Sequence, residues 1–175
     1  MKQYVLAVSG ALVLIVSAQS ADAFELQSPD IHNGAAIGLE QVYTRCGGQN
    51  VSPALVWREA PAGTRSFAVT AIDHNAPPND WSHWILIDIP AGVTSLAKGA
   101  APPAGARAVM TDFGDEGYGG PCPPTGSGVH HYEFTVWALR TPTVQFPPHA
   151  NAKDVAATLE KNALGKASIT GTFQR

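Results

Sequence analysis

The sequence predicts a mainly β domain in which two sheets pack together and one helix lies at the periphery near the C-terminus. Short segments with alternating or wholly apolar residues recur along the chain, separated by clusters of proline, glycine, asparagine and aspartate. Only one segment has the periodicity and capping residues of a helix. Few helices and many strands with long loops favour packed sheets. The predicted strands are residues 54–57, 66–73, 83–89, 130–139 and 167–173.

The helix is predicted to begin after Asn151, because Asp154 three residues later makes a pattern like a capping box. The positive charge of Lys161 would interact favourably with the negative C-terminal end of the helix dipole, and Gly165 is expected to end the helix. A long surface connection is expected over residues 97–105, where glycine, alanine and proline dominate. The helix should pack on the sheet through a face made of Val155, Leu159 and Ala163.

The first 23 residues have the features of a signal peptide. Lys2 gives a basic start, residues 5–16 are almost wholly apolar, and Ala21-Asp22-Ala23 fits the small-x-small cleavage pattern. An apolar run of about 12 residues is too short to span a bilayer. We therefore expect cleavage after Ala23, a single domain over residues 24–175 without a transmembrane segment, and a periplasmic or secreted protein.

The charge balance excludes some classes of partner. The chain of 175 residues has a formal net charge of −3, and removing the predicted leader takes away one acid and one base. Such a chain offers no broad basic face for nucleic acid or for an anionic membrane surface. Any recognition of an anion must therefore be local.

The two cysteines, Cys46 and Cys122, are expected to form a disulfide, because paired cysteines are typical of exported proteins. Closing a loop of this length stabilises a fold by roughly 4 kcal/mol in the chain-entropy model. The alternative is two buried free thiols.

Three predicted strands each have an apolar face that ends in an ionisable residue: Asp73, His83 or His130. These ends adjoin turn-rich segments, which points to one small site, with Tyr132 just inside it. Alternation alone cannot bring the three strands together, and each histidine could instead be a structural residue that caps its own strand. The predicted faces are Phe67, Val69, Ala71 and Asp73; His83, Ile85, Ile87 and Ile89; and His130, Tyr132, Phe134 and Val136.

Several motifs resemble the phosphatidylethanolamine-binding protein family, and its bacterial branch of Raf kinase inhibitor-like proteins is the most similar. The resemblance covers nearly all of the predicted mature chain in the right order. The two signature blocks correspond to DHNAP at 73–77 with WSHW at 81–84, and to GYGGPCPP at 117–124 with HHY at 130–132. Further similar motifs are CGGQNVSP at 46–53 and LGKAS at 164–168.

The resemblance implies an all-β fold, with a large antiparallel sheet packed on a smaller one. It also implies a shallow surface pocket for small anions such as phosphate, acetate, cacodylate or a phospholipid headgroup. No metal, no cofactor and no general catalytic activity go with the family. Carried over by position, the ligand-binding residues would be Asp73, His83, His130 and Tyr132, with Trp81 beside them and Gly120, Pro121, Cys122, Pro123 and Pro124 as a wall.

Two imidazoles, a phenol and loop N–H groups could together supply the donors that a phosphate requires. A carboxylate facing an anion repels it, so we expect Asp73 to hold a histidine as imidazolium. Anion affinity should then fall as the pH rises through the histidine range.

The chain departs from the family pattern at three positions. His74 replaces a proline, Asn75 replaces an acid, and His131 stands where the family usually has arginine. Ligand preference is therefore open. We hypothesise that Asn75 and His131 are two halves of one exchange, and we expect His74 to face solvent.

Other functions fit the sequence less well. A serine hydrolase is disfavoured because Thr125 breaks the G-x-S-x-G pattern around Ser127, and Ser82 adjoins His83 on a strand where neighbours diverge. Asp73, His83 and His130 could form a metal site, but they lack the usual ligand spacing. A module that binds or inhibits a protease or a signalling protein, with the pocket secondary, remains an alternative.

Overall fold

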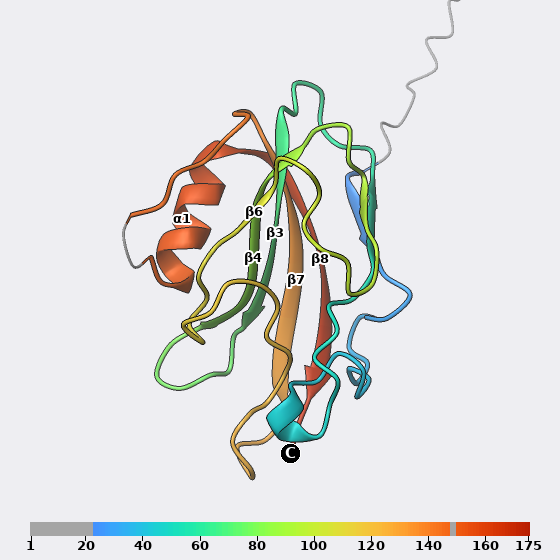
Figure 1. Ribbon diagram of the computed structural model, residues 1–175, viewed down its shortest axis with the longest axis vertical. Helices are drawn as coiled ribbons and strands as arrows, with labels where there is room; N and C mark the ends of the chain where they lie inside the picture. The colour runs from blue at the N-terminus through green and yellow to red at the C-terminus, as the bar shows by residue number, and fades with distance from the viewer. Residues whose placement is uncertain (1–22, 148–149) are drawn as a thin grey trace, which may run out of the picture.

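The computed structural model describes residues 23–147 and 150–175, and it has two antiparallel sheets with one helix on the outside (Figure 1). The predicted fold class is confirmed. The larger sheet has the strand order β6-β4-β3-β7-β8, and the smaller has the order β1-β2-β5. The elements are β1 Glu25–Gln27, the 3-10 helix η1 Thr44–Cys46, β2 Leu55–Arg58, β3 Ser66–Asp73, β4 Trp81–Pro90, β5 Ser95–Leu96, β6 Arg107–Ala108, β7 His130–Leu139, α1 Ala152–Asn162 and β8 Ala163–Phe173.

The long strands of the larger sheet follow the predicted segments closely. β3 and β7 have the predicted bounds, whereas β4 and β8 extend beyond them. β1, β5 and β6 were not predicted, because strands of two or three residues are too short to show a period.

The larger sheet is apolar on both faces. Its inner face packs against the smaller sheet, and there Trp57 meets Phe67 edge to face with ring centroids 5.3 Å apart. Its outer face is covered by α1, which lies to one side of the sheet in Figure 1. The buried residues beneath the helix include Ala68, Ile85, Ile87, Trp137, Leu139, Val155 and Leu159.

The N-terminus of α1 has the predicted capping box. The Asn151 side chain accepts from the Asp154 N–H at 3.1 Å, and the Asp154 carboxylate accepts from the Asn151 N–H at 3.2 Å. The predicted end at Gly165 is wrong. The helix ends at Asn162, and Ala163 already has extended backbone angles and begins β8. Pairing with β7 satisfies the backbone of this segment, so no glycine cap is needed.

Two register shifts in β4 change which residues face the core. Ala71 pairs with Trp84 and Ile72 with Ser82, so His83 is an extra residue in a β-bulge. A second shift lies near Asp88, whose φ is 58°. The prediction that His83 shares one face with Ile85 and Ile87 is therefore wrong, because the two isoleucines pack beneath α1 while His83 lines a pocket on the other face.

Within residues 23–147 and 150–175, the structure has no helix with the length and apolar composition of a membrane span. The predicted leader, residues 1–23, lies outside the described residues except for its last residue.

Candidate functional site

A pocket of about 260 Å³ lies at the end of the larger sheet where β3 ends and β4 and β7 begin. Asp73, His83, His130 and Tyr132 all line it. The strand register explains this meeting, because Asp73 pairs with Trp81 on one side and with Tyr132 on the other. β3 is thus the central strand that joins the two histidine-bearing strands.

The remaining lining is apolar and aromatic. Phe113, which the sequence did not single out, stands edge to face against His83 with ring centroids 5.0 Å apart and against Trp81 at 5.9 Å. Gly120 and Pro121, predicted as part of the wall, are buried but do not line the pocket. The other lining residues are Ala76, Pro77, Trp81, Phe113, Cys122, Pro123 and Pro124.

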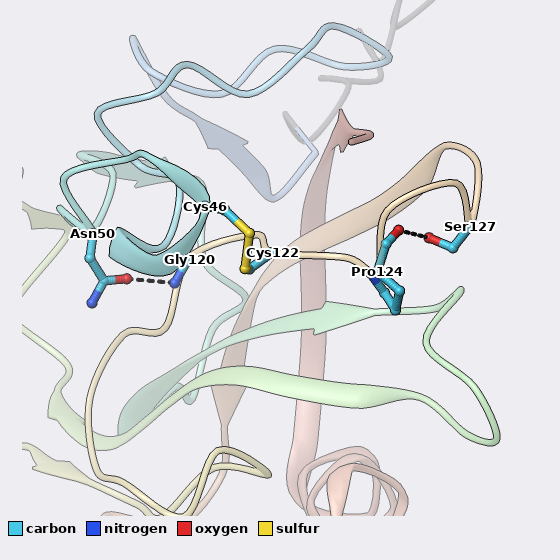
Figure 2. The surroundings of a disulfide bond; sticks show 6 residues. All are labelled: Cys46, Asn50, Gly120, Cys122, Pro124 and Ser127. Atoms are coloured by element: carbon cyan, nitrogen blue, oxygen red, sulfur yellow. Dashed lines mark hydrogen bonds between the residues drawn. A yellow bond between two sulfur atoms is a disulfide. The ribbon is translucent and has the colours of Figure 1, made fainter.

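The predicted disulfide between Cys46 and Cys122 is confirmed (Figure 2). It ties the pocket loop to η1, from which the chain continues to Asn50. Next to it, the Tyr43 N–H donates to the Pro121 carbonyl at 3.1 Å. The pocket wall is therefore fixed from behind by a covalent bond and a backbone hydrogen bond.

Gly120 has no room for a side chain. A Cβ atom at this position would lie 2.0 Å from the carbonyl oxygen of Gln41, so the two backbones approach as closely as only glycine allows. The Gly120 N–H donates to the side-chain oxygen of Asn50 at 2.7 Å. Since this N–H is occupied within the protein, it is not a free donor for an anion.

Asp73 and His130 form a buried pair. His130 Nδ1 lies 2.7 Å from the Asp73 carboxylate, and the two side chains are 2% and 4% exposed. The second carboxylate oxygen accepts from the Asn75 N–H at 2.8 Å. His130 Nε2 lies 2.9 Å from Ser127 Oγ. Both ring nitrogens of His130 therefore have protein partners, although the sequence led us to expect a free donor here.

His83 has one engaged nitrogen. Its Nδ1–H donates to the Gly119 carbonyl at 2.7 Å. Burial lowers the pKa of His83 below its ordinary value, and the hydrogen bond to Gly119 and the charge of Asp73 only partly oppose this effect. The ring is therefore neutral near neutral pH, and Nε2 makes no hydrogen bond within the described part of the chain.

Tyr132 brings an unpaired hydroxyl to the pocket. The residue is 1% exposed, and its Oη has no hydrogen-bond partner among the described residues. Burial raises the pKa of Tyr132, and both the charge of the Asp73 carboxylate and its proximity to the phenol raise it further, so the phenol keeps its proton. A buried donor without a partner is costly, and a bound ligand or water would satisfy it.

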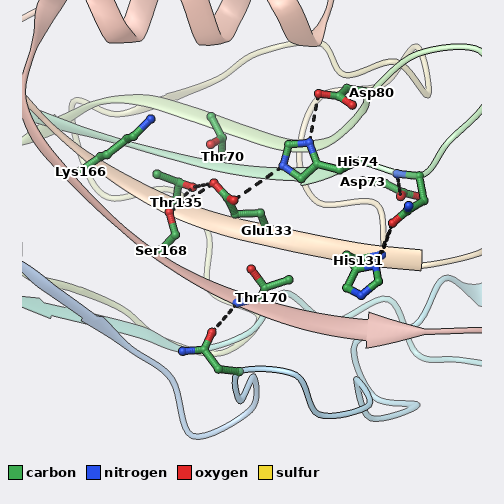
Figure 3. A network of polar contacts seen from close by, with 12 residues as sticks. Thr70, Asp73, His74, Asp80, His131, Glu133, Thr135, Lys166, Ser168 and Thr170 are labelled. Carbon is green, nitrogen blue, oxygen red and sulfur yellow. Dashed lines mark hydrogen bonds and ion pairs between the residues drawn. The ribbon is translucent and has the colours of Figure 1, made fainter. Parts of the chain in front are cut away.

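The three departures from the family pattern lie outside the pocket lining. The Asn75 side-chain oxygen accepts from the His131 N–H and lies 2.9 Å from His131 Nδ1, so these two residues do contact each other. His74 is half-exposed on the outer face, with Nδ1 3.0 Å from Asp80 and Nε2 3.7 Å from Glu133 (Figure 3).

A larger cavity of about 630 Å³ lies between α1 and the outer face of the sheet. Its ionisable groups include His74, Asp80 and Glu133; all three are at least partly exposed, and His74 contacts both carboxylates. The smaller pocket instead holds buried ionisable groups and an unpaired donor, so we place the candidate site there.

The metal alternative finds no geometric support. Among residues 23–147 and 150–175, no group of three or more histidine, cysteine or carboxylate side chains is placed to hold a metal ion. Asp73 and His130 are hydrogen-bonded to each other.

Comparison with known proteins assigns the family. The model of the phosphatidylethanolamine-binding protein family matches residues 27–174. The chain belongs to this family. It is 38% identical over 178 residues to the UPF0098 protein YbcL of Escherichia coli, covering 97% of each chain. The crystal structure of YbcL superimposes with a TM-score of 0.81, covering 87% of this chain and 98% of that one.

Another relative bears on export. LppC, a candidate lipoprotein of Mycobacterium tuberculosis, is 38% identical over 157 residues, covering 90% of this chain and 75% of LppC. Together with the disulfide between Cys46 and Cys122, this relative indicates an exported protein.

Proposed function

We propose that this protein is an exported, non-enzymatic binding protein that accepts a small anion, a phosphate or the phosphate of a phospholipid headgroup, in the pocket at Asp73, His83, His130 and Tyr132. We also propose that the leader is cleaved after Ala23 and that the mature protein is periplasmic or secreted. Intact mass of the exported protein would test the cleavage, because the mature chain should begin at Phe24.

The observation that carries the proposal is the buried hydroxyl of Tyr132, which has no hydrogen-bond partner within residues 23–147 and 150–175. It is a permanent donor in the pocket, and an anion oxygen would satisfy it. The pairing of Asp73 with His130 supports the same function, since a carboxylate held by an imidazole repels an incoming anion less than a free one.

His83 would provide the second contact. His83 is neutral near neutral pH, with its Nδ1–H on the Gly119 carbonyl and a lone pair on Nε2. An anion beside Nε2 raises the pKa of the ring, so binding brings a proton with it. Affinity should therefore fall as the pH rises.

Isothermal titration calorimetry with inorganic phosphate and with glycerophosphoethanolamine tests the proposal and distinguishes a free phosphate from a headgroup. Tyr132→Phe removes only the hydroxyl and should weaken binding by about tenfold, the value of one hydrogen bond to a charged group. Tyr43→Phe is the matched control, because Tyr43 does not line the pocket. Equal affinity in wild type and Tyr132→Phe, or no binding of either anion, would contradict the proposal.

A further inference from the structure

Ser127, His130 and Asp73 form a hydrogen-bonded series, and the proposed anion binding gives no role to Ser127. Ser127 Oγ lies 2.9 Å from His130 Nε2, and His130 Nδ1 lies 2.7 Å from the Asp73 carboxylate. A hydroxyl, an imidazole and a buried carboxylate in this order are the arrangement that activates a serine nucleophile. The hydroxyl end is accessible, because Ser127 is exposed in the turn that follows Pro124, whereas the other two residues are buried.

We propose that Ser127 is a nucleophilic serine that forms a covalent adduct with phosphoryl or acyl donors carrying a good leaving group. In this arrangement His130 is the general base and Asp73 is a positioning residue that fixes the imidazole tautomer. The inference goes beyond the proposed anion binding and does not depend on it.

The proton on Ser127 has two possible acceptors. Ser127 Oγ lies 2.8 Å from the Pro124 carbonyl as well as 2.9 Å from His130 Nε2. When His130 is an imidazolium, its Nε2–H donates to Ser127 Oγ, and the serine proton goes to Pro124. When His130 is neutral and its Nδ1–H donates to Asp73, Nε2 accepts a hydrogen bond from the Ser127 hydroxyl. Only the neutral state makes Ser127 a nucleophile.

The reaction with a phosphonofluoridate needs no group beyond Ser127, His130, Asp73 and solvent. Ser127 Oγ attacks phosphorus, an O–P bond forms, and the P–F bond breaks with loss of fluoride. The serine proton passes to His130 Nε2 and then to solvent. Asp73 keeps the Nδ1–H in place and stabilises the imidazolium that forms.

We expect one covalent event for each chain rather than turnover. The backbone N–H of Ser127 donates to the Pro124 carbonyl at 3.2 Å, so it is not free to stabilise an oxyanion at this residue. A serine hydrolase uses such N–H groups as oxyanion donors. Stoichiometric labelling without sustained hydrolysis is therefore consistent with a non-enzymatic protein.

Labelling of the full chain with a reporter-bearing phosphonofluoridate, followed by intact mass and peptide mapping, tests the proposal. Wild type should gain one adduct, located on Ser127, and Ser127→Ala should gain none. Ser95→Ala, at an exposed serine of β5, is the matched control and should label as wild type does. Asp73→Asn should label at least about 100-fold more slowly, within the range lost when general-base catalysis fails.

A double-mutant cycle tests whether Asp73 positions the His130 ring for the reaction or only stabilises the fold. His130→Ala should abolish labelling, and added imidazole should restore part of it. In the presence of imidazole, Asp73→Asn should have no further effect in the His130→Ala background, because Asp73 acts through the missing ring. Circular dichroism checks that each variant is folded.

The proposal is overturned if folded wild type gains no adduct, if the adduct maps to another residue, or if Asp73→Asn labels at the wild-type rate. Continued release of p-nitrophenol from p-nitrophenyl acetate beyond one equivalent would overturn the single covalent event and the non-enzymatic function together. Calorimetry with phosphate is a separate measurement. If folded wild type binds phosphate but gains no adduct, this inference is overturned and the proposed anion binding is not.

Discussion

The side chain of Asn50 holds the backbone of Gly120, with its amide oxygen 2.7 Å from the Gly120 nitrogen (Figure 2). The same amide donates from Nδ2 to the Tyr118 carbonyl at 3.1 Å, so it is hydrogen-bonded to the pocket loop on both sides of Gly119. The Gly119 carbonyl in turn receives the Nδ1–H of His83. A residue outside the pocket thereby fixes the orientation of a residue inside it.

Asn50 should contribute to the free energy of unfolding in two ways, through its side-chain hydrogen bonds and through its left-handed backbone conformation. Asn50→Gly loses two side-chain hydrogen bonds, at roughly 1 kcal/mol each, but keeps the left-handed backbone angle of 56° without strain. Asn50→Ala loses the same bonds and, like asparagine, keeps a Cβ atom in that conformation, so it should be about 1 kcal/mol less stable than Asn50→Gly. Urea unfolding of both variants gives the two free energies. If alanine proves no worse than glycine, the backbone angle contributes nothing.

Gly120→Ala should prevent normal folding of the pocket loop. The added Cβ would overlap the carbonyl oxygen of Gln41 and the backbone of Val42 and Tyr43, none of which can move as a flexible side-chain end would. We expect a loss of more than about 3 kcal/mol, in line with severe overpacking. Gly92→Ala is the control, because nothing lies within 4 Å of its Cβ position and its φ is not left-handed. Thermal unfolding should separate the two variants clearly.

Removing the disulfide should cost roughly 4 kcal/mol, because the bridge joins positions 76 residues apart and restricts the unfolded chain. The double variant Cys46→Ser, Cys122→Ser and the wild type in reducing agent should lose the same free energy in chemical unfolding. Because Cys122 lines the pocket, both should also bind phosphate more weakly than the oxidised wild type. A double variant as stable as the oxidised protein would show that the hydrogen bonds at Pro121 and Gly120 suffice to hold the loop.

Much of the architecture could be predicted from the sequence where a strand was long enough to show its period. β3 and β7 have their predicted bounds, and the capping box at Asn151 gave the start of α1. The end of α1 could not be predicted, because the signal at Gly165 is local whereas the pairing of β8 with β7 is not. Nor could the two bulges in β4, because they depend on the register with β3.

The candidate site divides in the same way. Asp73, His83, His130 and Tyr132 could be named from family resemblance and do meet in one pocket, although alternation placed His83 on the wrong face. The contact between Ser127 and His130 could not, because Ser127 lies on a turn of its own and the G-x-S-x-G pattern describes a different local geometry. Phe113 could not be predicted either, because only the fold brings its loop against His83.

The burial of His83 should make stability depend on pH in a defined window. In the folded protein its pKa is lowered by burial, whereas in the unfolded chain it has its ordinary value of about 6.5. At higher pH both states are neutral at this residue. As the pH falls below about 6.5, the unfolded chain takes up a proton that the folded protein does not, so stability is lost until the lower folded pKa is reached.

His83→Gln should therefore lose less stability than wild type on acidification from about pH 7.5 to 5, with a difference in slope of up to about 1.4 kcal/mol per pH unit inside that window. Urea unfolding at a series of pH values gives both profiles, and the other titrating groups largely cancel in the comparison. His32→Gln, at an exposed position outside the pocket, should retain the wild-type profile. Parallel profiles for wild type and His83→Gln would mean that the imidazole takes up its proton as readily inside the pocket as in the unfolded chain. The proton uptake proposed for anion binding would then lose its physical basis.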